Sequence, residues 1–378
     1  MRASSTRPRP SIVLISVDTL RADHLACYGY ARPTSPFIDS LAQRGTLFEE
    51  AQVPRPATSP SHASLLTGVM PRGHGVLANG MVMKTSVDTL AAALKRAGYE
   101  TAASVAVSHI GRKVGFARRF DHFLEPTVTD PNSDTRRFGE AVNADVRSMI
   151  DAHLAARNGK PLFLFVHYFE CHYPYRAWDK SEKTDPWNPA VQADRPRQLM
   201  RYDDGIRRVD ERIRELHDYV TAKLGPNVVF CITADHGEQI GDHGLAVGHA
   251  DIYRETVRVP LILSGPELPR GVRVKTAVST MDVPVFLARL GGARFVTAVD
   301  GHDLGPLIER SASWLPQLFS SAPKRLFLIT GAPAYTRSIA LIDGSSWYIK
   351  NFDYTYPQAW IDTPAAQEAA RGEVVPVS

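Results

Sequence analysis

The stretch Ile12-Val13-Leu14-Ile15-Ser16-Val17, followed at once by Asp18, decides the fold. Its continuous apolar and β-branched run is typical of a central strand that is covered on both faces. Similar runs recur at residues 162–168 and 227–233, and helical patterns lie between them. Apolar strands that alternate with amphipathic helices predict an α/β protein with a large β-sheet flanked by helices.

Helical patterns separate these strand-like runs. They lie at residues 35–44, 87–97, 134–157 and 199–223. Gly45 and Gly98 follow the first two patterns, and glycine commonly ends a helix because it accepts the left-handed backbone conformation. We therefore expect these four segments to cover the sheet.

The character of the chain changes after about residue 269. A short helical pattern at residues 281–290 precedes strand-like runs at residues 325–330, 338–342 and 346–349, which Gly-containing turns separate. Short strands joined by such turns are typical of an antiparallel sheet. We therefore expect a main domain over residues 1–268 and a small C-terminal α+β subdomain over residues 269–378.

The composition is that of an ordinary globular protein and argues against several classes. The 378 residues include 22% charged residues, and the net charge of +4 is not massed on one segment. This weakly favours a small anionic ligand and gives no case for nucleic acid. No run approaches the roughly 20 apolar residues of a membrane span, and the N-terminus lacks the pattern of a signal peptide. We expect a soluble, cytoplasmic protein without a membrane partner, and a homo-oligomer is compatible with the sequence.

Polar residues come soon after three of the strand-like runs, and one of these groups is Glu170-Cys171-His172, after the run at residues 162–168. Asp18 follows the first, and Asp235-His236 follow the run at residues 227–233. Open α/β sheets bind ligands beyond the carboxyl ends of their strands, so we expect these side chains at one edge. Two carboxylates and an imidazole suit Zn²⁺ or Mn²⁺ and admit Ca²⁺ or Mg²⁺ less naturally. The pattern fits a capping aspartate and a hydrogen-bonded histidine equally well.

A second feature is the segment Pro56-Ala57-Thr58-Ser59-Pro60-Ser61-His62-Ala63-Ser64-Leu65-Leu66-Thr67-Gly68. Pro60 suits the first position of a helix and Ser59 its cap, which places Thr58 just before a helix N-terminus. Free backbone N–H groups and the helix dipole favour an anion there. A hydroxyl that binds a divalent ion at such a place can lose its proton and attack phosphorus or sulfur. Without a metal, Thr58 is a turn residue.

Histidines gather in the same segments. The chain has 13, and many of them lie in these same segments, among them His62, His74, His172, His243 and His249. Imidazoles at a site bind ester oxygens or donate a proton to a leaving group. Each histidine taken singly is more often a surface or core residue. Asn79, in Ala78-Asn79-Gly80, equally suits a turn.

Six segments, taken together and in this order, resemble the sulfatase-like family of the alkaline phosphatase superfamily. They are residues 16–25, residues 58–68, His74-Gly75-Val76 with Asn79-Gly80, His172-Tyr173-Pro174-Tyr175, residues 233–238, and Gly248-His249 with residues 258–261. The resemblance implies a large mixed sheet of the alkaline phosphatase type with a small C-terminal antiparallel sheet. It implies one divalent metal ion, bound by Asp18, Asp235, His236 and Thr58 Oγ1. It also implies that Asn79, His172 and His249 contact the transferred group or the leaving oxygen. We expect His172 or His249 to protonate the leaving alcohol, and His62 and His74 to bind the substrate.

Three departures from the family pattern bear on the reaction. Sulfatases carry Cys or Ser at the position of Thr58 and convert it to a formylglycine, an aldehyde that threonine cannot form. His62 stands where the signal for that conversion has Arg, and Thr19 follows Asp18 in place of a second aspartate. We therefore expect a metal-dependent hydrolase that acts through a covalent Thr58 intermediate. Phosphoesters, either diesters or phosphonate monoesters, are favoured over sulfate esters.

Other functions stay open from the sequence. A sulfatase is the first alternative, a phospho-group transferase the second, and a non-catalytic binding protein on the same fold the third. A second metal ion, held by His172 and His249 with Glu170 as a further ligand, is another arrangement that the sequence allows.

Overall fold

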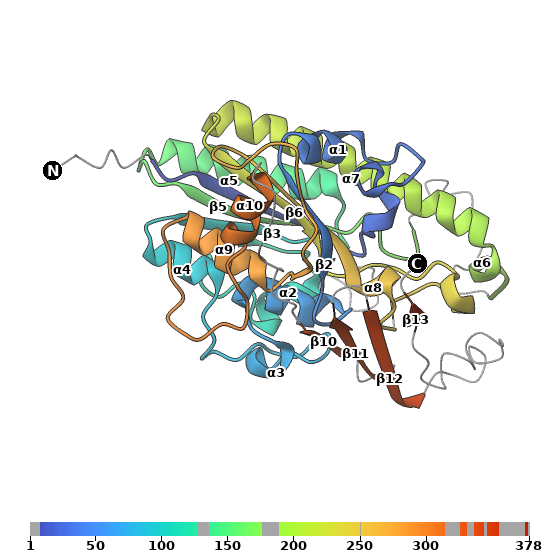
Figure 1. Cartoon of the computed structure of the whole chain (residues 1–378). Coiled ribbons are helices and arrows are strands. Elements are labelled where there is room, and N and C mark those ends of the chain that lie inside the picture. Colours follow the sequence, from blue (N-terminus) through green and yellow to red (C-terminus); the bar gives the residue numbers. More distant parts are fainter. Residues whose placement is uncertain are drawn as a thin grey trace.

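The computed structural model describes residues 8–127, 136–175, 189–249, 251–313, 326–330, 336–343, 346–354 and 375–376. Figure 1 shows a large sheet flanked by helices and a second, smaller sheet built from the C-terminal strands. The expected fold class, a large mixed β-sheet flanked by helices, is confirmed.

The large sheet has nine strands in the order β4-β3-β5-β1-β6-β7-β2-β8, with β9 also paired to β2. Their bounds are β1 Ser11–Val17, β2 Thr46–Gln52, β3 Glu100–Ser104, β4 His122–Leu124, β5 Leu162–Tyr168, β6 Val228–Ala234, β7 Arg258–Ser264, β8 Val272–Val274 and β9 Val278–Ser279. The strands from β4 to β6 are parallel to their neighbours, whereas β7 is antiparallel to both β6 and β2. The sheet is therefore mixed.

β1 lies in the middle of the sheet because its apolar run is covered on both faces. Its residues from Ile12 to Val17 are fully buried. Val17, the last residue of β1, pairs with Tyr168 at the end of β5 and with Ala234 at the end of β6. The three parallel strands therefore end level with one another, and the residues that follow them meet at one edge of the sheet.

Helices cover both faces of the sheet. α1 (Pro36–Gln43), α5 (Gly139–Ala155) and α7 (Arg195–Leu224) pack together on one face, and α2 (Thr58–Thr67), α4 (Leu90–Arg96) and α9 (Asp282–Leu290) pack together on the other (Figure 1). The four expected helices are present as α1, α4, α5 and α7, with ends that differ by a few residues. Asp134, the expected start of α5, lies outside the described residues.

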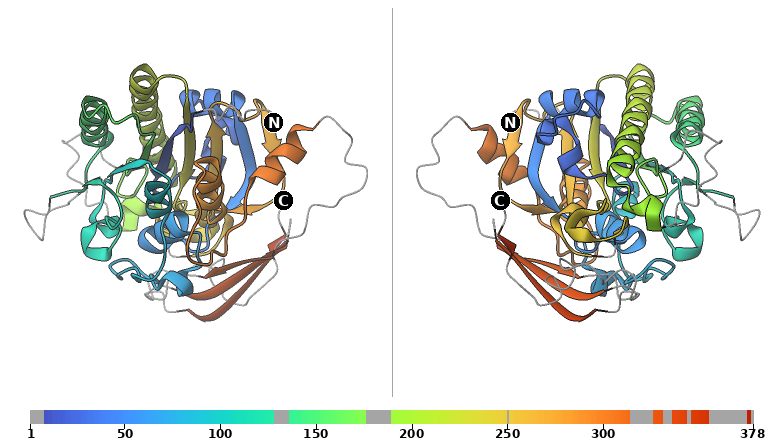
Figure 2. Two further views of the ribbon diagram at one scale, coloured as in Figure 1. Left: turned by 90° about the vertical axis from the view of Figure 1, so that its left-hand side faces the viewer. Right: turned by 90° about the vertical axis from the view of Figure 1, so that its right-hand side faces the viewer.

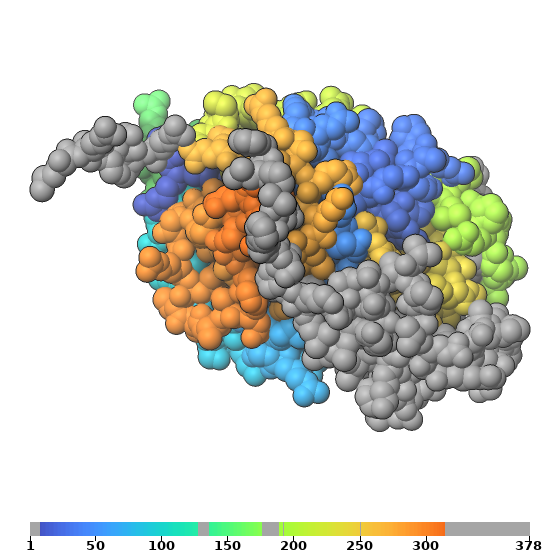
Figure 3. Space-filling model, viewed as in Figure 1, coloured from blue at the N-terminus to red at the C-terminus, as the bar shows by residue number. Residues whose placement is uncertain are grey.

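Four further helices complete the set of α-helices in the described chain. They are α3 (Pro71–His74), α6 (Pro189–Ala193), α8 (Arg254–Val257) and α10 (Gly305–Ala312). Figure 3 shows that residues 282–312, which include α9 and α10, form one continuous part of the surface on the side that faces the viewer. None of the described helices combines the length and the apolar character needed to cross a membrane. The expected cytoplasmic location stays a prediction.

β2 is a strand that the sequence analysis missed. Its centre carries Glu49 and Glu50, which interrupt the apolar pattern, and its pairing with β7 shifts register there. The two glutamates form ion pairs with Arg273 (2.8 Å) and Arg258 (3.3 Å). The two charged residues at this bulge interrupt the apolar pattern of a strand whose other residues are buried, so the pattern alone does not predict the strand.

The C-terminal strands form a four-stranded antiparallel sheet in the order β10-β11-β12-β13. Their bounds are β10 Leu326–Thr330, β11 Thr336–Asp343, β12 Ser346–Tyr354 and β13 Val375–Pro376. The small sheet lies at the end of the molecule that carries α2 and α3 (Figures 1 and 2). β8 and β9, which follow residue 268, pair with β2 in the large sheet. The expected division of the chain into a main domain and a C-terminal subdomain stays a prediction.

Candidate active site

The level ends of β1 and β6 bring three buried side chains together. Asp18 follows β1 directly, and Asp235 and His236 follow β6. All three are fully buried, and one ligand atom from each lies within 4.8 Å of the other two. Within the described part of the chain, this is the group of acidic and imidazole side chains compact enough to hold one metal ion. The residues predicted from the two strand ends are therefore neighbours in space.

Three of the four oxygens of these buried carboxylates lack a hydrogen bond within the described part of the chain. Both oxygens of Asp18 and Oδ2 of Asp235 accept no hydrogen bond from the described residues, while Oδ1 of Asp235 accepts from the Thr19 N–H (3.2 Å). Burial raises the pKa of Asp18 to about 8, and burial together with the charge of Asp18 raises the pKa of Asp235. A divalent cation between them would supply the missing positive charge, so the residues fit a metal site.

The hydrogen bond of His236 selects the nitrogen that faces this cluster. Its Nδ1 lies 3.0 Å from the carbonyl oxygen of Gly237 and donates to it. Nε2 therefore presents its lone pair, at 3.3 Å from Asp235 Oδ2 and 3.9 Å from Asp18 Oδ1. Burial lowers the pKa of His236 well below its usual value, which keeps the ring neutral. A neutral imidazole beside two carboxylates is a ligand set that suits Zn²⁺ or Mn²⁺.

Thr58 joins the cluster from the first turn of α2. Its Oγ1 lies 3.5 Å from Nε2 of His236, and the side chain is buried. Its position at the start of α2 places the hydroxyl at the positive end of the helix dipole. The four residues predicted to bind the metal are thus brought together.

The start of α2 differs from the prediction. The helix begins at Thr58, with Ala57 in the cap position, two residues before the expected start at Pro60. Pro60 fits here too, because the first helical residues need no N–H for the intrahelical ladder. The expected cap, Ser59, uses its hydroxyl to donate to the carbonyl oxygen of His109 (2.6 Å). The prediction that Thr58 just precedes the helix was therefore wrong.

Asn79 holds the start of α2 from a neighbouring loop. Its Oδ1 accepts the backbone N–H of Ser59 at 2.8 Å, and this leaves the Nδ2 group as a donor. Asn79 is exposed, so its amide is accessible from solvent. The predicted contact between Asn79 and the substrate stays a prediction.

His62 ties the beginning of α2 to the central strand. Its Nδ1 donates to the Thr58 carbonyl oxygen (2.8 Å), and its Nε2 accepts from Ser16 Oγ of β1 (2.9 Å). Burial and the neighbouring His167 lower the pKa of His62 well below its usual value, so the ring is neutral. Both ring nitrogens are used within the protein, and the predicted substrate contact stays untested.

His74 supports the other side of the same helix. Its Nδ1 accepts the Val76 N–H (3.1 Å), so the proton lies on Nε2, which is 3.0 Å from Ser64 Oγ. Burial, with the charge of Lys84, lowers the pKa of His74 to about 4. The structure gives His74 a position against α2, and its predicted contact with the substrate stays untested.

His172 and His249 lie on the more open side of the cluster. The His249 ring centroid is 4.3 Å from that of His236 and 5.2 Å from that of His172. The His172 ring stacks on Phe169 at 4.4 Å. Both histidines are partly exposed, unlike the buried cluster beside them. The two predicted proton donors therefore border the metal-ligand group where a ligand can enter.

The sequence that carries these strand ends, the hydroxyl and the histidines matches a known family. The sulfatase family model matches residues 10–293, which contain every site residue described above. The chain belongs to the sulfatase family. It is thus an ester hydrolase of the alkaline phosphatase superfamily.

Relatives of this sulfatase-family hydrolase agree with the assignment. A choline-sulfatase of Rhizobium meliloti is 24% identical, over 91% of this chain and 78% of its own length. An ulvan-active sulfatase of Formosa agariphila is 24% identical over 80% of this chain, which spans 65% of that longer relative. The structure of a phosphonate monoester hydrolase of Agrobacterium radiobacter has a TM-score of 0.71 at 20% identity, over 91% of this chain and 87% of that one. At this identity the structural likeness shows a common fold.

The sulfatase-family site contains two residues that the sequence analysis did not assign. His167 of β5 places Nε2 3.3 Å from Asp18 Oδ2, while its Nδ1 accepts the Ala106 N–H (3.3 Å). Glu238 is fully buried and contacts His249. The signal for His167 was a lone imidazole in an otherwise apolar strand. The signal for Glu238 was an acidic residue two positions after His236, one of the predicted metal ligands.

Glu170 does not join the two open histidines. Its Oε1 accepts the Gly139 N–H at the start of α5, and its Oε2 accepts the Phe169 N–H (3.0 Å). Among the described residues no second group of metal ligands matches the compactness of the buried cluster. The second metal ion therefore gains no ligand from Glu170 and stays a prediction.

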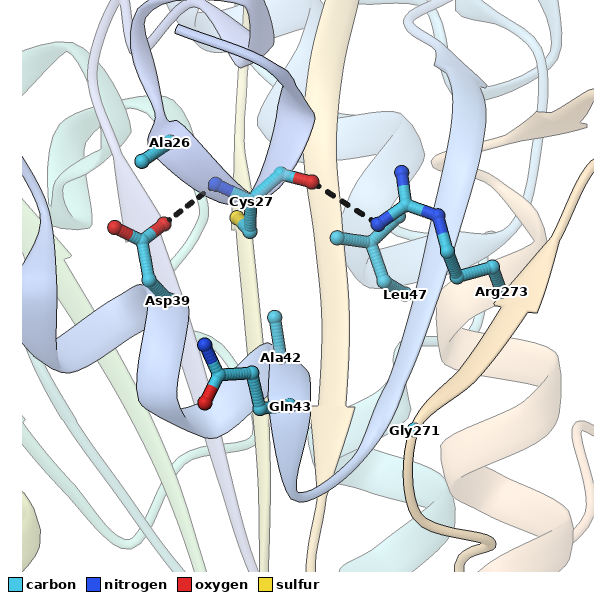
Figure 4. Close-up of a pocket in the computed structure, with 8 residues that line it drawn as sticks. All are labelled: Ala26, Cys27, Asp39, Ala42, Gln43, Leu47, Gly271 and Arg273. Carbon is cyan, nitrogen blue, oxygen red and sulfur yellow. Dashed lines mark hydrogen bonds between the residues drawn. The ribbon is translucent and has the colours of Figure 1, made fainter. Parts of the chain in front are cut away.

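The sulfatase-family site is separate from a pocket of about 550 Å³ beside Cys27 (Figure 4). That pocket is lined by Ala26, Cys27, Asp39, Ala42, Gln43, Leu47, Gly271 and Arg273. Burial and the hydrogen bond with Asp39 raise the pKa of the Cys27 thiol, so the thiol stays protonated and is a poor nucleophile. The pocket shares no lining residue with the buried cluster.

Proposed function

We propose that this sulfatase-family hydrolase cleaves small anionic phosphoesters, namely phosphodiesters or phosphonate monoesters, through a covalent ester of Thr58. The observation that supports this most is the 3.5 Å separation between Thr58 Oγ1 and His236 Nε2, beside three carboxylate oxygens of Asp18 and Asp235 that accept no hydrogen bond from the described residues. A threonine hydroxyl there can act as a nucleophile, and it cannot become the aldehyde that sulfate-ester enzymes of the family use.

Four groups would hold one divalent metal ion in this proposal: Asp18, Asp235, His236 and Thr58 Oγ1. Their donor atoms favour Zn²⁺ or Mn²⁺, with Ca²⁺ or Mg²⁺ as alternatives. When bound, the ion would lower the pKa of the Thr58 hydroxyl and offset negative charge on the ester. The dipole of α2 adds a positive potential at the same place.

The first half of the reaction transfers the phospho-group to Thr58. The deprotonated Thr58 oxygen attacks phosphorus, and the bond between phosphorus and the alcohol oxygen breaks. The alcohol oxygen takes a proton from His249, which leaves a neutral imidazole and a phosphothreonine ester. The exposed amide of Asn79 can donate to an oxygen of the transferred group.

The surroundings of the two open histidines support His249, rather than His172, as the proton donor. Burial opposes protonation of His249, but the hydrogen bond and charge of Glu238, with the charges of Asp18 and Asp235, raise its pKa overall. Burial, with the nearby His249, lowers the pKa of His172 well below its usual value. His249 is therefore the better proton source near neutral pH.

The second half of the reaction restores the enzyme. Neutral His249 takes a proton from a water molecule while the water oxygen attacks phosphorus. The bond between phosphorus and Thr58 breaks, the phospho-product leaves, and His249 is again protonated. A phospho-group transferase would differ only here, because an alcohol would replace the water.

Sulfate-ester hydrolysis is the second candidate for this site. The sulfatase family model and the choline-sulfatase relative favour it. The same attack on sulfur would produce a threonine sulfate. The two candidates differ in the atom that Thr58 attacks, phosphorus or sulfur, so a direct comparison of substrates separates them.

The choice of substrate is tested with four 4-nitrophenyl esters that share one leaving group. The purified protein is loaded with Zn²⁺, Mn²⁺ or Ca²⁺ and assayed with the sulfate, the phosphate monoester, a phosphodiester and a phosphonate monoester. We expect kcat/KM for the diester or the phosphonate monoester to exceed that for the sulfate by roughly tenfold or more. A preference for the sulfate of the same size would reverse the order of the two candidates.

The role of Thr58 is tested with Thr58→Ala. The variant should bind metal with stoichiometry close to that of the wild type, because three ligands remain, and should lose turnover by roughly 10³-fold or more. Thr58→Ser is the matched control and should keep part of the activity, since it retains a hydroxyl. Mass spectrometry of acid-quenched wild type should find the phospho-group on the peptide with Thr58. Full activity of Thr58→Ala would remove the proposed nucleophile.

A further inference from the structure

The carboxylate of Glu238 is buried next to the site. Glu238 is not one of the expected metal ligands. It lies on the segment that leaves β6, two residues after His236, and is fully buried. A buried carboxylate is unfavourable unless hydrogen bonds or opposite charge compensate it. The partners of Glu238 therefore indicate why the acid is there.

Both oxygens of Glu238 are used, and each contacts a different loop of the site. Oε1 lies 3.2 Å from Nδ1 of His249, and Oε2 accepts the backbone N–H of Tyr173 at 2.9 Å. Tyr173 directly follows His172. One carboxylate thus joins the two loops that supply the open histidines of the site.

The contact with Glu238 fixes the orientation of the His249 ring. Because a carboxylate only accepts hydrogen bonds, Nδ1 of His249 must carry the proton that faces Glu238. The nitrogen on the other side of the ring, Nε2, is then left for the substrate. The rings of His236 and His172 flank His249, at 4.3 and 5.2 Å between centroids, and limit its rotation.

We infer that Glu238 is a positioning residue, which holds His249 so that Nε2 protonates the leaving alcohol oxygen. The inference rests on the proposed reaction at Thr58. In the transfer step the proton moves from Nε2 to the alcohol oxygen as the bond to phosphorus breaks. The Glu238 carboxylate keeps its hydrogen bond to Nδ1 throughout and itself gains no proton. This division of roles is the one that carboxylate–histidine pairs have in hydrolases.

The test compares substrates that need a proton donor with substrates that do not. Two phosphodiesters or phosphonate monoesters share the transferred group and differ in the leaving group, 4-nitrophenol in one and an alkyl alcohol in the other. 4-Nitrophenolate leaves without protonation, whereas an alkoxide does not. We expect Glu238→Gln to lower kcat for the alkyl ester at least tenfold more than for the 4-nitrophenyl ester. His249→Gln should show the same selective loss, and the double variant should lose no more than His249→Gln alone.

A matched control is available on the same fold. Glu100 accepts from His153 Nδ1 at 2.8 Å, and this carboxylate–imidazole pair lies at the start of β3, at the opposite end of the strand from its carboxyl edge. Glu100→Gln should leave the ratio of the two kcat values unchanged. Metal content and thermal unfolding of each variant show whether a loss of activity reflects a loss of the fold.

The outcomes separate this inference from the proposed function. Equal losses of Glu238→Gln on both substrates, or losses that multiply in the double variant, would overturn the positioning role while Thr58-dependent turnover remained. Turnover by the wild type that does not depend on Thr58 would instead remove the proposed reaction. A selective loss on the alkyl ester, absent in Glu100→Gln, is the result that the structure supports.

Discussion

Arg21 is the residue that ties the loop after β1 to the loop after β6. Its guanidinium is almost fully buried, and Nη1 donates to Asp242 Oδ2 (2.7 Å) and to the carbonyl oxygen of Glu238 (3.0 Å). Nη2 of the same guanidinium donates to Asp23 Oδ2 (2.7 Å). A buried arginine is stabilised only while such partners remain, so these contacts keep the strand-end loops in one arrangement.

The pairing of Asp242 predicts a pH-dependent contribution to stability. Burial alone would raise the pKa of Asp242, but Arg21, helped by the Ile240 N–H and Arg195, lowers it to about 2. A carboxyl with a lowered pKa in the folded state stabilises the protein above its unfolded pKa and loses that effect as pH falls toward the folded value. Asp242→Asn should therefore reduce the free energy of unfolding by about 2 kcal/mol at pH 7.

Urea unfolding of wild type and Asp242→Asn across a pH series checks this. The difference between the free energies of unfolding of the two proteins should be constant from pH 7 down to about pH 4. It should shrink as pH falls from about 4 toward 2. Asp218→Asn, at an exposed position of α7, is the control and should change little. A difference that grows on acidification would contradict the assigned pairing.

At the scale of elements, the N-terminus of α1 is capped by a residue of another helix. Ser35, in the cap position of α1, makes no capping hydrogen bond with its side chain. Instead, the carboxylate of Asp210 on α7 accepts the N–H groups of Phe37 (3.0 Å) and Ile38 (2.8 Å). A carboxylate at this end also interacts favourably with the helix dipole. The packing of α1 on α7 is therefore coupled to the formation of its first turn.

Removal of this cap should destabilise the protein. Asp210→Ala leaves two N–H groups without a partner at a buried place, and we expect a loss of about 1–3 kcal/mol in the free energy of unfolding. Hydrogen exchange of the α1 amides should accelerate more than that of α5. Asp204→Ala, an exposed change on α7, serves as the reference. Equal effects of the two substitutions would show that the cap contributes nothing.

Elements also show where sequence patterns mislead. The apolar strands β1, β5 and β6 were predicted almost to the residue, because continuous apolar runs allow few other structures. β2 was missed because Glu49 and Glu50 stand at its centre, and their ion pairs with arginines of other strands are long-range. The start of α2 was misplaced because Pro60 suits the third helical position as well as the first.

At the scale of the whole molecule, the proposed metal site joins parts of the chain that are far apart in sequence. Asp18 follows β1, Asp235 follows β6, and Thr58 begins α2. A ligand that binds only when these elements are assembled stabilises the entire fold. In the metal-free protein, two close buried carboxylates oppose the same assembly.

Metal binding should therefore raise the stability of the folded protein as a whole. Addition of Mn²⁺ or Zn²⁺ at 100 times its Kd to chelator-treated protein should add about 2.7 kcal/mol to the free energy of unfolding. Asp18→Asn should abolish this gain, and without metal it should be no less stable than the wild type, because one of two like charges is gone. Asp145→Asn, at a carboxylate on α5 outside the cluster, should keep the gain. Thermal unfolding with and without metal measures both effects, and an unchanged gain in Asp18→Asn would exclude Asp18 as a ligand.

The sequence by itself determined the central strands, the covering helices and the kinds of side chain that stand at the strand ends. These features are local, because apolar periodicity and the chemistry of single residues are read within a few positions. Family resemblance added the order of the motifs and with it the list of expected site residues.

Only the tertiary structure decided which of these residues meet, and how. The register that sets Val17 opposite Tyr168 and Ala234 makes Asp18 a neighbour of Asp235, and it depends on strands more than 100 residues apart in sequence. The same packing brings His167 to Asp18 and buries Glu238 against His249. Hydrogen-bond partners, and through them the nitrogen that each histidine presents, follow from contacts between distant segments, and no local pattern encodes such contacts.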